Sequence, residues 1–96
     1  MLQVKITRHA EFNGGEYHAR VPGIDRIGRL AWVEREGKRV VEHTIVPPEI
    51  SGRGVGGKLV AALMADAREQ GFKVVPQCSF VAAAMADHPE WTDLRG

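Results

Sequence analysis

Hydrophobicity alternates along the N-terminal half of the chain. Apolar residues from Leu2 to Ile6 are separated by polar ones, and this period of two predicts a half-buried strand over residues 2–7. The turn sequence Asn13-Gly14-Gly15 comes next, and a second strand is predicted over Glu16–Val21, where Pro22-Gly23 ends it. We expect these two strands to pair as a hairpin.

Two further strands are predicted before the middle of the chain. They cover Ile27–Arg35 and Arg39–Val46, and they flank the turn sequence Glu36-Gly37-Lys38 as a second hairpin. Pro47-Pro48 ends the alternation because proline has no N–H to donate to a ladder. The N-terminal half is therefore predicted to be an antiparallel meander of four strands.

The period changes after a glycine-rich segment. Apolar residues from Val55 recur at helical spacing up to the stop at Gly71, which predicts the clearest helix of the chain. A short strand over Phe72–Val75 follows, and a second, shorter helix over Ser79–Ala86 is ended by His88-Pro89. The chain is predicted to fold as one α/β domain over residues 1–96.

Length and composition are those of a small globular domain. The 96 residues are 44% hydrophobic and 26% charged, and 13 basic against 12 acidic side chains give a formal net charge of +1. Neither sign forms a block and the arginines are spread over the meander, so we expect no nucleic-acid or membrane partner. The arginines of the meander are interpreted as a solvated face: Arg8, Arg20, Arg26, Arg29, Arg35 and Arg39.

Cysteine usage and the N-terminal segment indicate a compartment. The single cysteine, Cys78, cannot form an internal disulfide, and the alternating N-terminus lacks the apolar run of a signal peptide. No segment approaches the roughly 18 consecutive apolar residues of a membrane span. We therefore expect a soluble cytoplasmic protein, and we expect no metal.

A glycine-rich loop carries the strongest functional signal. Four of the six residues from Gly52 to Gly57 are glycine, and they lie between a predicted strand and a predicted helix. Such a backbone can approach a ligand closely and direct free amide groups at it, while the helix N-terminus adds partial positive charge. Arg53 and Lys58 add full positive charges, so a pyrophosphate is the predicted ligand.

Two common phosphate-binding motifs fit this loop poorly. Its spacing from Gly52 to Gly57 matches a dinucleotide fingerprint, but no acid follows at the required distance of roughly 20 residues, where Val74-Val75-Pro76-Gln77 stands. The nucleoside-triphosphate P-loop requires Ser or Thr after the lysine, and Leu59 occupies that position.

The acyl-CoA loop of the GNAT acetyltransferase superfamily fits better. Its pattern, Arg/Gln-x-x-Gly-x-Gly/Ala after an antiparallel meander, is matched in its second half by Gly54-Val55-Gly56. The chain closely resembles the short stand-alone GNAT-like acetyltransferases in several segments: His43-Thr44-Ile45-Val46-Pro47, Gly52 to Leu63, Lys73 to Val81, and His88-Pro89-Glu90. Ser51 stands where the superfamily pattern has Arg or Gln, and Ala84 stands where many relatives have tyrosine.

The resemblance implies a fold, a co-substrate and a reaction. It implies an antiparallel meander followed by a CoA-binding helix, a further strand and a short C-terminal helix, with acetyl-CoA as co-substrate. The acceptor would be an unidentified small-molecule or protein amine. The residues implied in cofactor binding are Ile45, Val46, Ser51, Gly52, Arg53, Gly54, Val55, Gly56, Gly57 and Lys58.

Cys78 is the first candidate catalytic residue. It lies just past the last predicted strand and near the start of a helix, whose dipole lowers a thiol pKa, so the thiolate could accept an acetyl group. In the resembling family this position has been regarded as catalytic or acyl-accepting. The alternative is a small buried hydrophobic residue.

His43 is the second candidate, as a base that removes a proton from the acceptor amine. Since neighbours on a strand face opposite sides, only one of Glu42 and His43 is expected to face the site, and His43 is favoured. A packed strand histidine is the alternative. His88 is expected to close a helix end, and three aromatic residues are interpreted as core or core-edge: Trp32, Phe80 and Trp91.

A function from another class also fits the sequence. Ser51, Ala84 and the lack of room for an acceptor-specificity lobe favour a non-catalytic acyl-CoA-binding or protein-interaction module. Turnover separates this module from a transferase.

Overall fold

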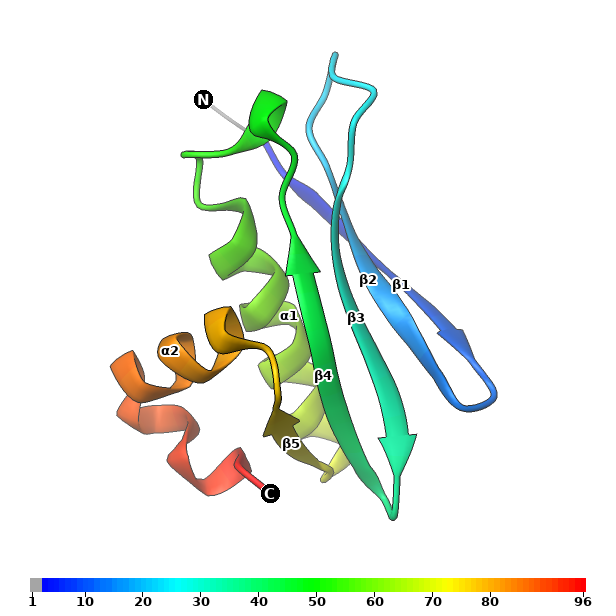
Figure 1. Ribbon diagram of the computed structural model, residues 1–96, viewed down its shortest axis with the longest axis vertical. Coiled ribbons are helices and arrows are strands. Elements are labelled where there is room, and N and C mark those ends of the chain that lie inside the picture. Colours follow the sequence, from blue (N-terminus) through cyan, green and yellow to red (C-terminus); the bar gives the residue numbers. More distant parts are fainter. Residues whose placement is uncertain (1–2) are drawn as a thin grey trace.

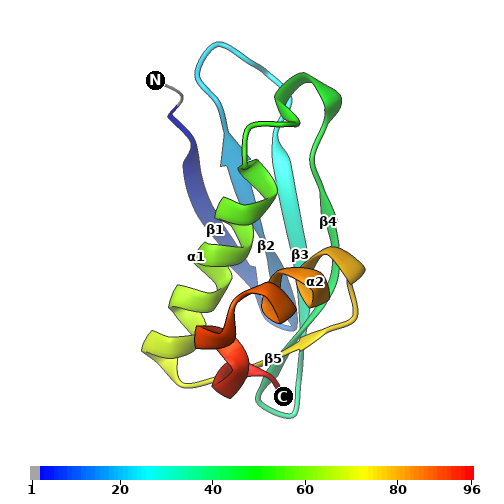
Figure 2. The ribbon, with the colours of Figure 1, turned by 90° about the vertical axis from the view of Figure 1, so that its left-hand side faces the viewer.

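A single five-stranded sheet forms the frame of the molecule, and helices cover one of its faces (Figures 1 and 2). The computed structural model describes residues 3–96. The strand order is β1-β2-β3-β4-β5, with antiparallel pairs up to β4 and a parallel β4–β5 pair. The elements are β1 Lys5–Glu11, β2 Gly14–Arg20, β3 Gly28–Arg35, β4 Lys38–Ile45, the 3₁₀ helix η1 Pro48–Ile50, α1 Val55–Gln70, β5 Lys73–Pro76, α2 Ser79–Asp87 and the 3₁₀ helix η2 Pro89–Leu94.

The predicted four-strand antiparallel meander is confirmed, and so are both helices and the last strand. The bounds of the first strand were wrong: β1 covers Lys5–Glu11, and Leu2 lies outside the described residues. The cause is the position of β1 at the sheet edge, where pairing with β2 rather than apolar alternation sets the strand length. The two 3₁₀ helices were not predicted.

The first hairpin turn was also placed wrongly. Gly14 and Gly15 are not turn residues but the start of β2, and the turn lies at Phe12-Asn13. A Cβ on Gly15 would lie 2.5 Å from the His9 carbonyl oxygen and 2.8 Å from the Trp32 ring. Gly15 is therefore required for close packing of the indole against the strand, not for a turn dihedral.

A β-bulge interrupts the β3–β4 pair. Ala31 pairs with His43 and Trp32 pairs with Val41, so Glu42 is an extra residue on β4. Such a bulge bends the strand and alters the alternation of its side chains. The bulge lies where β4 also loses its other neighbour, since the parallel β4–β5 register ends at Val41 and Pro76.

The core lies between the sheet and the helices. Helix α1 packs against β2 and β3, and α2 packs against β4 and β5. Apolar side chains of α1 that recur at helical spacing are fully buried there: Leu59, Val60, Leu63, Met64 and Ala67. This burial confirms the face assigned to α1 from its sequence.

Arg39 corrects the interpretation of the meander arginines as a solvated face. Its residue is only 7% exposed, and its guanidinium lies over the rings of Trp32 and Phe72, at 4.4 and 4.1 Å from their centroids. It donates hydrogen bonds to Glu34 and to the Tyr17 hydroxyl. The two rings and the two acceptors offset the desolvation of this charge, which the sequence pattern does not reveal.

Candidate functional site

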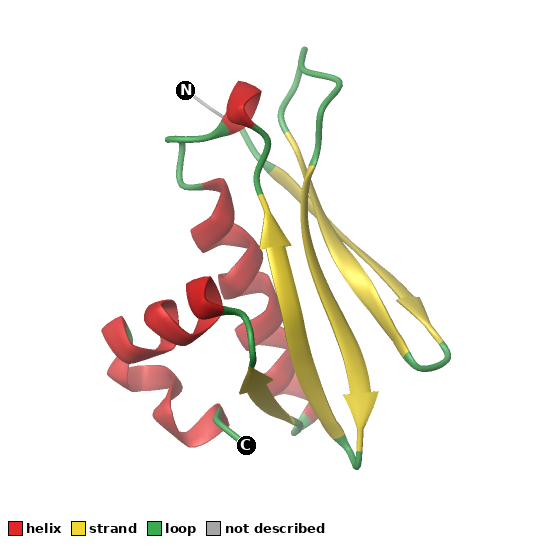
Figure 3. Cartoon of the chain, in the orientation of Figure 1, coloured by secondary structure: helices red, strands yellow, loops and turns green. Residues whose placement is uncertain are grey.

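The glycine-rich loop connects η1 to the N-terminus of α1 (Figure 3). Gly52 and Gly54 have φ of +74° and +75°, and no atom lies within 4 Å of a Cβ built at either position. Gly54 is the N-cap of α1 in the left-handed conformation. The positive φ values explain why glycine occupies these two positions, and the open space leaves the loop backbone accessible.

The loop presents amide donors without protein acceptors. Within residues 3–96 no side chain caps the start of α1, and the first N–H of the helix to find a backbone acceptor is that of Lys58, which donates to Gly54 O. Arg53 and Lys58 are exposed, and neither forms an ion pair with a described residue. Free amides, two unpaired cations and a 16-residue helix dipole together favour an anion at this place.

Ser51 uses its side chain differently. Its hydroxyl donates to Pro48 O at 3.1 Å and closes η1, so the hydroxyl is engaged within its own turn. The Ser51 hydroxyl is therefore not free to donate to a ligand at the loop in this structure.

Phe80 connects the loop to the next helix. A Cβ on Gly56 would lie 2.6 Å from the far end of the Phe80 ring, so this glycine permits the ring to lie against the first turn of α1. The Phe80 residue is 45% exposed, so of the two alternatives, core or core-edge, it does not belong to the core. Trp32, in contrast, is buried, and Trp91 packs against the core.

Cys78 lies where β4 and β5 separate. Beyond the last β4–β5 pair, the amides of Gln77 and Cys78 both donate to Val41 O, and Cys78 becomes the N-cap residue of α2. Its Sγ is 3.6 Å from the Thr44 Oγ1 on β4. The strand residues past Val41 therefore have no β5 partner, and the thiol lies beside this unpaired edge.

Several groups around the sulfur alter its ionisation. Partial burial raises the pKa of Cys78, but amide donors from Val81 and Phe80 and the hydroxyl of Thr44 lower it, and the net pKa is below the ordinary thiol value. This agrees with the effect of a helix N-terminus on a thiol. A thiolate at Cys78 is thus more populated than in a free cysteine.

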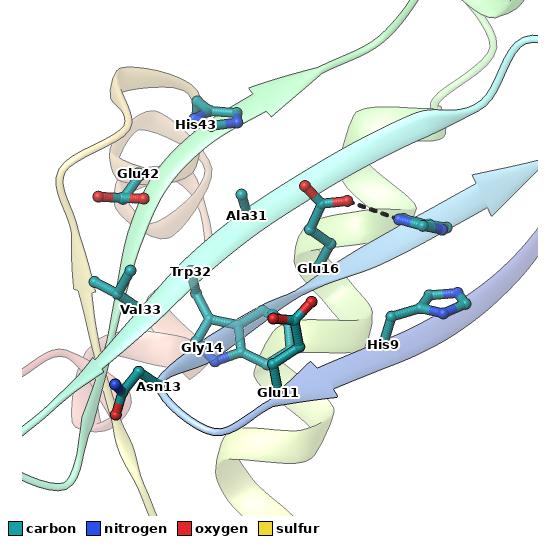
Figure 4. Close-up of a pocket in the computed structure, with 12 residues that line it drawn as sticks. His9, Glu11, Asn13, Gly14, Glu16, Ala31, Trp32, Val33, Glu42 and His43 are labelled. Carbon is teal, nitrogen blue, oxygen red and sulfur yellow. Dashed lines mark hydrogen bonds and ion pairs between the residues drawn. The ribbon is translucent and has the colours of Figure 1, made fainter.

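His43 points away from Cys78. It lies on the sheet face opposite the helices and lines a hollow of about 530 Å³ together with Glu42 (Figure 4). The prediction that only one of Glu42 and His43 faces a given site was wrong. Both line this hollow, because the bulge at Glu42 breaks the alternation of side chains along β4. The structure therefore does not bring His43 and Cys78 to the same face.

The hollow is rich in titratable side chains. Its lining includes no lysine or arginine, and its ionisable residues are His9, Glu11, Glu16, His18, Glu42 and His43. The Glu16 carboxylate lies 2.8 Å from the His18 Nε2, and this hydrogen bond lowers the pKa of Glu16. The His9 and His18 rings are 4.0 Å apart. The cluster forms only on folding, because its members come from β1, β2 and β4.

Sequence reasoning missed Thr44 and the hollow. Thr44 could have been noticed as the strand residue with a hydroxyl next to the candidate His43, but its contact with Cys78 spans 34 positions. The predicted role of His88 agrees with the structure: it is the C-cap of α2 and its ring stacks on Trp91 at 4.2 Å.

A comparison with protein families matches the model described as GCN5-related N-acetyl-transferase over residues 16–94 of the 96-residue chain. The chain belongs to this family. The match spans β2 to η2, so it includes the loop, Cys78 and Thr44. No curated protein matches the chain in a sequence comparison.

Membership in the GNAT family fits the geometry. The meander, the parallel β4–β5 pair that separates beyond Val41, and the glycine loop at the N-terminus of α1 form the GNAT arrangement in this chain. The family assignment supports acetyl transfer as the class of reaction, and the family typically uses acetyl-CoA. Residues 3–96 contain no helix long and apolar enough to cross a membrane, and no group of three or more His, Cys, Asp or Glu side chains that could hold a metal ion.

Proposed function

We propose that this GNAT domain is a small cytoplasmic acetyltransferase that takes its acetyl group from acetyl-CoA and passes it to an amine. The observation that carries the proposal is the set of amide groups between Gly52 and Gly57 that lack acceptors within residues 3–96, next to two cations without an ion-pair partner there. A diphosphate supplies acceptor oxygens and negative charge at the same place. A reactive free thiol at Cys78 is consistent with a reducing compartment.

The co-substrate would be bound along the loop and the free edge of β4. The amides from Gly52 to Gly57, with Val55 at the helix start, would bind the pyrophosphate, and the Arg53 and Lys58 cations would lie beside it. Ile45 and Val46 lie on the part of the chain that no longer pairs with β5, so their backbone is available to the pantetheine arm. Ser51 would contribute its backbone, since its hydroxyl is bonded to Pro48.

Two routes of transfer use the candidate residues. In the direct route, the amine nitrogen bonds to the thioester carbonyl carbon, the carbon–sulfur bond breaks, CoA leaves as a thiolate and the amine proton passes to His43, directly or through water. In the second route, the Cys78 thiolate bonds to the thioester carbonyl carbon and CoA leaves as a thiolate. The amine nitrogen then bonds to the acetyl carbon, the bond to the Cys78 sulfur breaks, and the amine proton passes to the departing thiolate or to water. The lowered pKa of Cys78 supports the second route, whereas the first route requires the amine to approach from the sheet face opposite the helices, where His43 lies.

Calorimetric titration with acetyl-CoA and with free CoA tests the binding step. We expect micromolar binding to the wild type and a loss of about tenfold in Arg53→Ala, which corresponds to roughly 1.4 kcal/mol for one phosphate contact. Arg35→Ala is the matched control, because Arg35 is also exposed and lies at the end of β3. Equal affinities for the two variants, or no binding by the wild type, would refute the claim that the loop binds the CoA pyrophosphate.

Turnover with isotopically labelled acetyl-CoA and a library of amines tests the chemistry. If the Cys78→Ala variant transfers labelled acetyl to an amine at the wild-type rate, the cysteine route is eliminated. Trapping of labelled acetyl on the wild type, and its absence in Cys78→Ala, would establish that route. Tight binding of acetyl-CoA without transfer to any amine would instead favour the non-catalytic acyl-CoA-binding module.

A further inference from the structure

Among residues 3–96, Thr44 is the one side chain within hydrogen-bonding range of the Cys78 sulfur. The Thr44 Oγ1 is 3.6 Å from the Cys78 Sγ, and both residues are half-buried. Thr44 belongs to β4, where it pairs with the fully buried Leu30. It follows the Glu42 bulge and the last β4–β5 pair, and its side chain contacts Cys78, the N-cap residue of α2.

A hydroxyl suits both protonation states of the sulfur. Next to a thiol, the Thr44 oxygen accepts the S–H; next to a thiolate, the same hydroxyl rotates and donates its proton. The backbone amides of Phe80 and Val81, in the first turn of α2, also lower the pKa of this thiol. The contact with Thr44 is the side-chain hydrogen bond that the sulfur makes among residues 3–96.

A valine at position 44 would keep the shape and the strand preference but remove the donor. Threonine and valine are both β-branched and both suit a strand, so packing alone does not require the hydroxyl. The hydroxyl has no other partner among the described residues. Its contact with the sulfur is therefore the interaction that distinguishes threonine from valine here.

We propose that Thr44 is a positioning residue that fixes the Cys78 sulfur between β4 and α2 and stabilises its thiolate. Its relevance to acetyl transfer rests on the proposed function, but the effect on the thiol is a property of the protein alone. The hydroxyl lies against the sulfur, so its proposed effect on transfer acts through Cys78.

The pH dependence of Cys78 alkylation tests the proposal. The chain has one cysteine, so the rate of modification by iodoacetamide, followed by mass spectrometry across pH, reports this sulfur only. We expect the midpoint to rise by about one pH unit in Thr44→Val and in Thr44→Ala, because a hydrogen bond to the charged form is lost. Thr44→Ser keeps the hydroxyl, so its midpoint should lie close to that of the wild type.

Thr7→Val is the matched control, since Thr7 is a half-buried strand residue on β1 at the opposite edge of the sheet. An unchanged midpoint in folded Thr44→Val or Thr44→Ala, or an equal shift in Thr7→Val, would overturn the assignment. A midpoint in Thr44→Ser that is raised as much as in Thr44→Val would also overturn it, because a purely structural effect would shift both variants.

The alkylation assay contains no CoA, so its result is separate from that of the proposed function. If the midpoint shifts but the protein binds no acetyl-CoA, the role of Thr44 stands and the proposed acetyltransferase function fails. If the midpoint does not shift but the protein is an active transferase, the proposed role of Thr44 fails and the acetyltransferase function stands.

Discussion

Replacing Tyr17 with phenylalanine should destabilise the protein although it deletes one atom. The Tyr17 residue is 2% exposed, and its hydroxyl donates to the Asp66 Oδ2 at 2.5 Å while accepting from the Arg39 Nη1 at 2.7 Å. One oxygen thus joins β2 to β4 and to α1. Burial and the bond to Asp66 raise the pKa of Tyr17 well above its ordinary value, so the donor proton is present at neutral pH.

The size of the effect follows from the charges left behind. Hydrogen bonds to charged groups are worth about 1.5–3 kcal/mol each, and two are lost. Asp66 keeps Arg8 and is 22% exposed, so water and Arg8 replace part of its loss, whereas the Arg39 side chain is 8% exposed and retains Glu34. We expect Tyr17→Phe to cost about 3 kcal/mol, or roughly 12–24 °C in Tm for a domain of this size.

Urea unfolding followed by circular dichroism measures this cost. A double-mutant cycle with Asp66→Ala should give a coupling of at least about 1 kcal/mol, since the two residues share one hydrogen bond. Phe12→Leu is the control, because Phe12 is 94% exposed at a hairpin turn. A loss below about 0.5 kcal/mol in Tyr17→Phe, or additive effects in the cycle, would refute the reasoning.

Two predictions concern backbone geometry, and urea midpoints check both. Gly15→Ala should lower the free energy of unfolding by about 2 kcal/mol or more, because its Cβ would meet the His9 carbonyl and the Trp32 ring. Gly57→Ala, at an exposed helical position with open space around it, should raise the free energy of unfolding by about 0.5 kcal/mol. Equal effects of the two substitutions would contradict the packing argument. Glu36→Asn should gain about 0.5–1 kcal/mol, since Glu36 has φ of +54° in a two-residue turn that asparagine favours; an unchanged midpoint would show that the turn is not strained.

The local periods of the sequence were sufficient to predict most of the fold. Strands β2 to β4 and helix α1 show their buried faces as periods of two and of 3.6, because each packs one face against the same core. Strand β1 is different: from Thr7 to Glu11 its sequence is largely polar, since it lies at the sheet edge with an exposed face. Its extent is set by pairing with β2, which no local pattern records.

The site was predictable only where it depends on local chain geometry. The loop and the place of Cys78 at a helix start follow from glycine content and helical period. The contact between Thr44 and Cys78, the burial of Arg39 and the bulge at Glu42 depend on which strands meet across the sheet. These are tertiary effects, and a reading of neighbours along the chain assigns the wrong face to His43.

The extra residue at Glu42 has a consequence for how such a chain can change over generations. Since Val41 and His43 already pair with successive residues of β3, deletion of the Glu42 codon would leave a regular ladder in which every other side chain keeps its present face. The carboxylate and the bend of the strand could therefore be gained or lost in a single genetic event. Insertion of one residue elsewhere in β4, without a new bulge, would instead exchange the faces of all residues beyond it.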